Sequence, residues 1–149
     1  MAAVDFDRIR AVVARENGLA VVATARTDGS VQSSVVNAGV LEHPVSGDPV
    51  VGLVAQGGSA KLSHLRVRPR IAVTWRAGWQ WLTVEGAVEL AGPDDPLDGV
   101  DAEMLRLLLR DVFVGAGGTH DDFDEYDRVM AAERRTAVLV HPDRVYGVG

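Results

Sequence analysis

The segment Gly57–Lys61 holds the residue types of an anion-binding site. It reads Gly-Gly-Ser-Ala-Lys and joins a strand-like run to a helix-like run, so its glycines would let backbone N–H groups approach a ligand. The N–H groups that begin a helix, the Ser59 hydroxyl and the Lys61 ammonium would then face one anion. A capping serine and a solvated lysine would explain the same residues without a ligand. The spacing of a nucleotide-binding P-loop is absent. Three further cations follow closely in the sequence: Arg66, Arg68 and Arg70.

The strand-like segment Trp79–Gly86 carries two of the three tryptophans of the chain. Alternation along a strand would place one set of side chains on a common face, namely Trp79, Trp81, Thr83 and Glu85. The opposite face is aliphatic and suits a core, with Leu82, Val84 and Val88. The tryptophans could stack on a planar ring or pack against another subunit, and packing against a subunit is the favoured interpretation.

The residues needed for several other common kinds of site are missing from the sequence. The four histidines fall in separate segments without the spacing of metal ligands, so no metal site is expected: His43, His64, His120 and His141. The chain has no cysteine, which excludes thiolate chemistry, and the absence of a Gly-x-Ser-x-Gly motif leaves acyl transfer without visible apparatus. Gly115–Gly118 follows a helix-like run rather than a strand, so it is interpreted as a linker and not as a dinucleotide-binding loop.

Composition narrows the class of protein. A chain of 149 residues with 47% hydrophobic content is expected to form a single domain over residues 1–149. The net charge of −6 disfavours nucleic acid as a partner. No apolar run approaches the ~18 residues that cross a bilayer, and the first residues do not resemble a secretory signal. A cytoplasmic protein that does not bind membranes is therefore expected.

Turn signals divide the chain into short strands and a few helices. Strands are expected over residues 19–25, 31–41, 50–55, 71–76, 79–90, 136–140 and 144–146. Helices are expected over residues 5–16, 60–66, 100–113 and 121–133. Runs of strands with scattered helices and no βαβ alternation favour an antiparallel barrel decorated by helices.

The expected helix over residues 100–113 has apolar residues on most of its circumference. Such a helix needs cover on two sides, and in a small domain the second cover could be another subunit. A deep position in the core of one chain is the alternative. The sequence thus favours a homodimer.

With these segments placed, the chain resembles the split β-barrel flavin and deazaflavin oxidoreductases. This is the superfamily of pyridoxamine 5′-phosphate oxidase, and the likeness is to its F420-binding actinobacterial branch. The resemblance spans nearly the whole length and is carried by Leu19–Gly29 with Val31–Ser34, by Ser59–Leu65 with Arg68-Pro69, and by Gly78-Trp79 with Val84–Gly86. In the last third it is carried by His120–Tyr126, Met130, Arg134-Arg135 and Val145–Gly147.

This resemblance implies a mainly β, antiparallel split barrel with helices, assembled as a homodimer. In the family the Ser-x-Lys segment holds the cofactor phosphate, which agrees with the helix-terminus argument for Ser59 and Lys61. Segments equivalent to Gln32–Ser34 and Val54–Gln56 line the side of the site that holds the cofactor ring. The Trp79 region and the C-terminal segment reach the site from the partner subunit. The cofactor-binding residues implied are Gln32, Ser33, Ser34, Gln56, Gly58, Ser59, Ala60, Lys61, His64 and Trp79.

Departures from the family pattern bear on the choice of cofactor. Members that bind flavin mononucleotide (FMN) usually have an arginine in the strand before the Ser-x-Lys segment, and residues 50–55 contain none. The deazaflavin coenzyme F420 is therefore favoured over FMN. Deazaflavin members often have a basic residue where Ser59 stands and an asparagine where His64 stands, so contacts to the phosphate or to the polyglutamate tail are expected to differ.

The function implied is an F420-dependent reductase that transfers a hydride from the reduced deazaflavin to a small, conjugated, electron-poor substrate. The protein would supply binding, orientation and exclusion of water, because the cofactor carries the chemistry. No catalytic acid stands out; Tyr126, His64, Ser34 and solvent are the candidates. Two alternatives remain open at this stage: a carrier of a flavin, F420 or a related tetrapyrrole without turnover, and an FMN-dependent oxidase.

Overall fold

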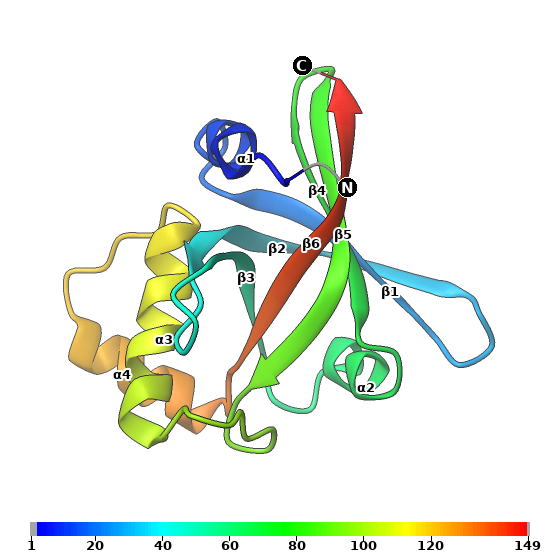
Figure 1. Cartoon of the computed structure of the whole chain (residues 1–149). Helices are drawn as coiled ribbons and strands as arrows, with labels where there is room; N and C mark the ends of the chain where they lie inside the picture. The colour runs from blue at the N-terminus through cyan, green and yellow to red at the C-terminus, as the bar shows by residue number, and fades with distance from the viewer. Residues whose placement is uncertain (1–2, 149) are drawn as a thin grey trace.

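The computed structural model describes residues 3–148 and folds them into a closed, antiparallel, six-stranded barrel (Figure 1). Around the barrel the strands follow the order β1-β2-β3-β6-β5-β4, and β4 closes the circle by pairing with β1. The strands are β1 (Leu19–Ala25), β2 (Val31–Glu42), β3 (Pro49–Ala55), β4 (Arg70–Ala77), β5 (Gln80–Ala91) and β6 (Thr136–Val148). The split β-barrel predicted from the sequence is confirmed.

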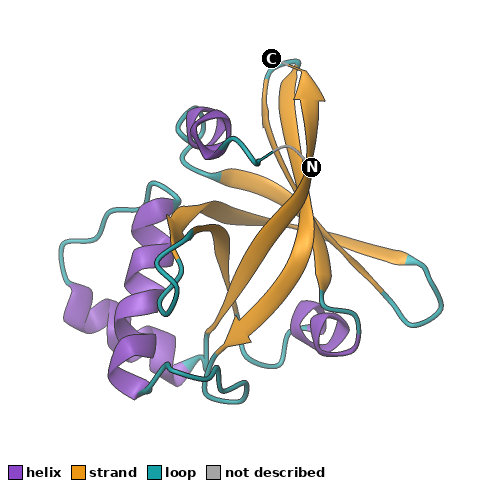
Figure 2. Ribbon diagram, in the orientation of Figure 1, coloured by secondary structure: helices purple, strands orange, loops and turns teal. Residues whose placement is uncertain are grey.

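Four helices decorate the barrel: α1 (Phe6–Val13), α2 (Ala60–Val67), α3 (Ala102–Gly115) and α4 (Phe123–Ala132). Three of them begin at an aspartate whose carboxylate accepts backbone N–H groups of the first turn: Asp5, Asp101 and Asp122. Helices α3 and α4 lie together on one side of the barrel, and α2 lies apart from them (Figure 2). None of the described helices is both long and apolar enough to cross a membrane.

Strand β6 separates two hydrophobic cores because its successive side chains point to opposite faces. Val138 and Val140 lie in the core inside the barrel. Ala137 and Leu139 lie in a second core, between the outside of the barrel and the helices α3 and α4. Both faces are covered, which explains why residues 137–140 are all apolar instead of alternating with polar residues.

The C-terminal strand is continuous, whereas the sequence predicted two strands separated at Pro142. The pairing of β5 with β6 shifts register beside Pro142, between Glu85 and Gly86, so a local bulge accommodates the proline. Gly86 is required there, because a Cβ atom would collide with the backbone of His141. The bulge therefore keeps the strand intact where the sequence suggested a break.

Helix α3 finds its cover within this chain. Leu108, Leu109 and Val112 are buried in the second core, which also contains Tyr126 of α4. The alternative of a deep position in one core therefore accounts for most of its apolar surface. Only Leu107 and Val114 remain exposed among its large apolar side chains. The helix by itself gives no reason to expect a second subunit.

Candidate functional site

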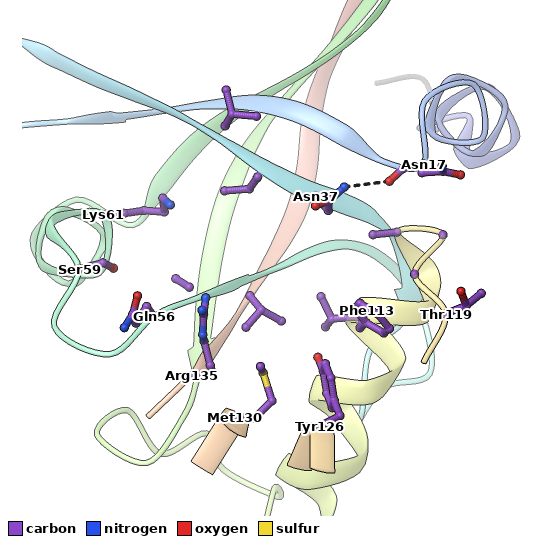
Figure 3. A pocket seen from close by; sticks show the side chains of 18 residues that line it. Asn17, Asn37, Gln56, Ser59, Lys61, Phe113, Thr119, Tyr126, Met130 and Arg135 are labelled. Atoms are coloured by element: carbon purple, nitrogen blue, oxygen red, sulfur yellow. Dashed lines mark hydrogen bonds between the residues drawn. The ribbon is translucent and has the colours of Figure 1, made fainter. Parts of the chain in front are cut away.

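A cavity of about 720 Å³ lies between α2 on one side and α3 and α4 on the other (Figure 3). Parts of strands β2 and β3 contribute the remaining wall. Its lining residues change in character from one end to the other. They are polar or cationic beside α2, apolar in the middle, and amides and a hydroxyl at the far end. Such a gradient suits an elongated ligand with an anionic end and a planar body.

The end beside α2 offers hydrogen-bond donors that have no partner within residues 3–148. Ser59 precedes α2, but its side chain makes no capping hydrogen bond, and its buried Oγ atom has no hydrogen-bond partner among the described residues. Lys61 lies in the first turn of α2 and points into the cavity (Figure 3). Burial, and secondarily the charge of Arg135, lower the pKa of the Lys61 ammonium. An anion here would satisfy the hydroxyl and relieve the repulsion between the cations.

Arg135 completes this group, which we call the anion pole and define as Ser59, Lys61 and Arg135. Arg135 lines the cavity from the turn between α4 and β6. In that turn Arg134 adopts a φ of 50°, and the N–H of Arg135 donates to the carbonyl oxygen of Met130 at 2.9 Å. This is the left-handed helix ending usually made with glycine. It turns the chain so that Arg135 faces the cavity while Arg134 pairs with Asp94 outside it.

The middle of the cavity is apolar and includes Val54, Met130, Phe113 and the ring of Tyr126. The Tyr126 hydroxyl donates to the carbonyl oxygen of Leu109 at 3.0 Å. Burial, the largest cause, raises the pKa of this phenol to about 12. Tyr126 therefore serves the core and is a poor proton donor.

The far end carries hydrogen-bonding groups from two segments. The Asn37 side-chain Nδ2 donates to the Asn17 carbonyl oxygen at 3.0 Å, which fixes the orientation of its amide (Figure 3). Gly117, Gly118 and Thr119 line the same end. The segment interpreted from sequence as a linker is therefore a wall of the cavity, and its glycines let it approach β2 and Asn17 closely.

Of the residues predicted to bind a cofactor, Gln56, Ser59 and Lys61 line the cavity. Gly58 forms the turn before α2, with a φ of 80°, and Ala60 is the first residue of that helix. Gly58 and Ala60 do not line the cavity themselves, and neither do the other five predicted residues: Gln32, Ser33, Ser34, His64 and Trp79.

These five residues occupy three places. Gln32, Ser33 and Ser34 precede the part of β2 that lines the cavity, which is residues 35–37. The Nδ1 atom of His64 is 2.9 Å from the Thr24 hydroxyl. Trp79 lies in the turn before β5, where its side chain is 95% exposed.

The three arginines that follow the Ser-x-Lys segment are engaged elsewhere. Arg66 pairs with Asp95 through two hydrogen bonds of 2.8 and 2.7 Å, and Arg70 pairs in the same way with Asp143. Arg68 donates to the carbonyl oxygen of Thr27. The second cation of the anion pole is instead Arg135, which comes from a distant part of the chain. In the sequence, Arg135 stood out only as part of Arg134-Arg135, one of the pairs that carry the family resemblance in the last third of the chain.

Two histidines that are distant in sequence meet in the structure. His43 and His141 both contact the Oε1 atom of Glu89, at 3.0 and 2.5 Å. The Nδ1 atom of His43 accepts the backbone N–H groups of Val45 and Ser46, so its proton resides on Nε2. A metal bound to Nε2 would displace the proton from Nε2 to Nδ1. The Nδ1 atom could then no longer accept the two backbone hydrogen bonds. Hydrogen bonding therefore accounts for the cluster.

No model of a known protein family matches the chain. Among solved structures, the conserved hypothetical protein Rv2991 of Mycobacterium tuberculosis superposes with a TM-score of 0.68 at 18% identity, over 98% of this chain and 85% of that one. A pyridoxamine 5′-phosphate oxidase-related FMN-binding protein of Nostoc punctiforme superposes with a TM-score of 0.66 at 14% identity, over 97% and 83%. An F420 reductase superposes with a TM-score of 0.60 at 14% identity, over 97% and 98%.

These likenesses establish the fold as the split β-barrel of pyridoxamine 5′-phosphate oxidase-like proteins. The match to the F420 reductase extends over nearly the full length of both chains.

Proposed function

We propose that this protein is an oxidoreductase that binds the deazaflavin F420 and reduces a small, conjugated, electron-poor molecule. The observation that carries the proposal is the anion pole at one end of a cavity whose middle is apolar. A phosphate group between Lys61 and Arg135 would accept a hydrogen bond from the Ser59 hydroxyl, which otherwise stays buried and unpaired. The fold shared with an F420 reductase supports the same assignment.

The residues of the chain would bind and orient. Ser59, Lys61 and Arg135 would hold the phosphate, and the apolar middle of the cavity would enclose a planar ring and exclude water. When bound, reduced F420 supplies a hydride, and the substrate also needs a proton. Tyr126 is unsuited to supply it, because its hydroxyl is committed to Leu109 and its pKa is about 12. Solvent is the proton source we favour.

The choice of F420 over FMN rests on β3, which ends beside the cavity without an arginine. Fluorescence titration of the purified protein with both cofactors tests it, and tighter binding of F420 is expected. Tighter binding of FMN would reverse the ranking in favour of an FMN-dependent oxidase.

Turnover is tested by offering reduced F420 with a panel of quinones, enones and tetrapyrroles. F420 that binds but is not oxidised faster by any acceptor would identify a carrier.

We also propose that two copies of the chain form a homodimer through the outer face of β1 and β2. Leu19, Val21 and Val35 are exposed there, and Val21 pairs directly with Val35 across the two strands. Val35 also lines the cavity, so a second copy seated on this face would cover the mouth of the site. An apolar strand face that continues into a ligand cavity is typical of an interface between subunits.

Light scattering at micromolar concentration tests the dimer. The wild-type protein is expected at twice the mass of one chain, and Val35→Asp is expected to shift it toward the monomer. Val67→Asp is the matched control, because Val67 is equally exposed but lies on α2. A stable wild-type monomer would overturn the proposal.

A further inference from the structure

Among the described residues, Glu133 is the carboxylate that pairs with a cation of the anion pole. Its Oε1 atom accepts two hydrogen bonds from Arg135, from Nε at 3.0 Å and from Nη2 at 2.8 Å. Both side chains are roughly one third exposed or less. Arg135 thus keeps its Nη1 group for a ligand while its charge is partly offset.

The backbone fixes Glu133 beside the pole. The N–H of Gly57, in the loop that leads to Ser59, donates to the carbonyl oxygen of Glu133 at 3.1 Å. Gly57 has no room for a side chain, because a Cβ atom would lie 2.7 Å from the Cβ of Arg134. The turn that carries Glu133 and Arg135 is therefore locked against the loop that carries Ser59. The carboxylate stays near any anion bound there.

The charges around the pole come from few groups. Two cations, Lys61 and Arg135, and one carboxylate, Glu133, leave a net charge of +1. Arg134 is neutralised by Asp94, and Tyr126 stays protonated. On α2, His64 is the other titratable group nearby, and it is occupied with Thr24.

We infer that Glu133 makes the anion pole select a singly charged phosphodiester over a doubly charged phosphate monoester. This inference rests on the proposed function, since it assumes that the pole holds a cofactor phosphate. A net charge of +1 is balanced by a phosphodiester, which is the linkage in F420. The terminal phosphate of FMN has a second pKa near 6 and is mostly a dianion at neutral pH. A carboxylate beside the pole repels the dianion twice as strongly as the monoanion.

The test compares wild type with Glu133→Gln, using FMN itself as the probe at two pH values. FMN is mostly a monoanion at pH 5.5 and mostly a dianion at pH 7.5. Because the interaction free energy scales with ligand charge, a gain of about threefold for the monoanion becomes about tenfold for the dianion. Glu133→Gln is therefore expected to bind FMN about threefold more tightly than wild type at pH 5.5 and about tenfold at pH 7.5. F420 is expected to gain only about threefold at either pH.

Two control variants separate local charge from other causes. Glu125→Gln removes the same charge from α4 at an exposed position outside the cavity lining, and it is expected to leave both Kd values unchanged. Glu133→Asp keeps the charge and is expected to keep the wild-type preference. Taking the ratio of variant to wild type at each pH cancels any effect of pH that the two proteins share. Thermal melts verify that each variant is folded.

The outcomes distinguish the inference from the function on which it rests. A ratio of variant to wild type that is the same at both pH values would overturn charge selection by Glu133, even if FMN binding improves. Lys61→Ala is measured alongside. If Lys61→Ala leaves the Kd of both FMN and F420 unchanged, the pole does not hold the phosphate, and the proposed function fails together with the inference.

Discussion

Two arginines between α3 and α4 and one lysine of the anion pole are held in opposite ways. On the outer side of the second core, Arg106 and Arg110 both donate to the carboxylate of Asp127, at distances between 2.5 and 2.9 Å. In the anion pole, no carboxylate among residues 3–148 offsets the Lys61 charge, and burial depresses the pKa of its ammonium. Paired arginines join helix α3 to helix α4, which stabilises the fold. A half-buried cation without a carboxylate partner costs stability, which makes Lys61 a candidate functional residue.

The contrast is sharpest for Lys61→Ala, which has the largest expected effect. A charge-assisted hydrogen bond to phosphate contributes about 1.5–3 kcal/mol, so the Kd for F420 should rise roughly ten- to a hundredfold. The free energy of unfolding should stay the same or rise, because the substitution removes a half-buried charge that costs stability. Calorimetric titration and chemical denaturation measure the two quantities.

Arg70→Ala is the matched control for this experiment. It removes the same charge from a surface pair with Asp143, outside the cavity lining. Its Kd should equal that of wild type. An equal weakening in both variants would mean that net charge, and not a contact at the pole, governs binding.

Asp127→Asn should show the reverse pattern. The substitution leaves two arginine side chains without their shared carboxylate, and the expected loss is about 1–2 kcal/mol in the free energy of unfolding. Binding of F420 should be unaffected, because Asp127 does not line the cavity. Asp124→Asn is the control, since Asp124 is largely exposed and lies 3.8 Å from Arg110. If Asp127→Asn weakened binding without destabilising the fold, the division into structural and functional cations would be wrong.

The hydrogen bonds from Arg106 and Arg110 to Asp127 also predict how the stability of the fold depends on pH. Hydrogen bonds from Arg110, and then from Arg106, lower the pKa of Asp127 from 3.8 to about 2. A depressed pKa in the folded state gives stability that is present above pH 4 and is lost as the pH falls toward 2. Thermal midpoints of wild type and Asp127→Asn should therefore converge between pH 4 and pH 2. A constant difference over this range would argue against the ionised pair.

Ser59→Ala has the smallest expected effect on stability. A serine that caps a helix contributes about 1 kcal/mol, but the Ser59 side chain makes no capping bond and its hydroxyl is buried and unpaired. Removing it should change the free energy of unfolding by less than about 0.5 kcal/mol, while F420 binding should weaken roughly five- to tenfold. A loss of about 1 kcal/mol in stability with unchanged binding would restore the capping interpretation.

Local patterns were sufficient for the strands and for part of the site. Alternation and turn residues located the strands, although the last one was predicted as two, and the segment Gly57–Lys61 was identified from glycine, hydroxyl and charge alone. The bulge opposite Pro142 was not predictable, because it depends on the register with β5. Trp79 was assigned to a strand, but it belongs to the tight turn before β5.

Contacts between distant segments account for what the sequence did not reveal. Arg135 reaches the cavity because Arg134 adopts a left-handed conformation, which the residue type does not predict. Glu89 joins His43 and His141 across separations of 46 and 52 residues. Spacing rules for ligands within one segment cannot detect such groups. They depend on which strands become neighbours when the barrel closes.

The position of β6 in the barrel has a consequence for biosynthesis. This last strand pairs with β3 on one side and β5 on the other, and it contributes to both hydrophobic cores. While a ribosome is still translating residues 136–148, the edges of β3 and β5 have no partner and the apolar faces of both cores are open. Closure must follow translation of β6, so the nascent chain passes through an interval of exposed strand edges in which chaperones would be needed most.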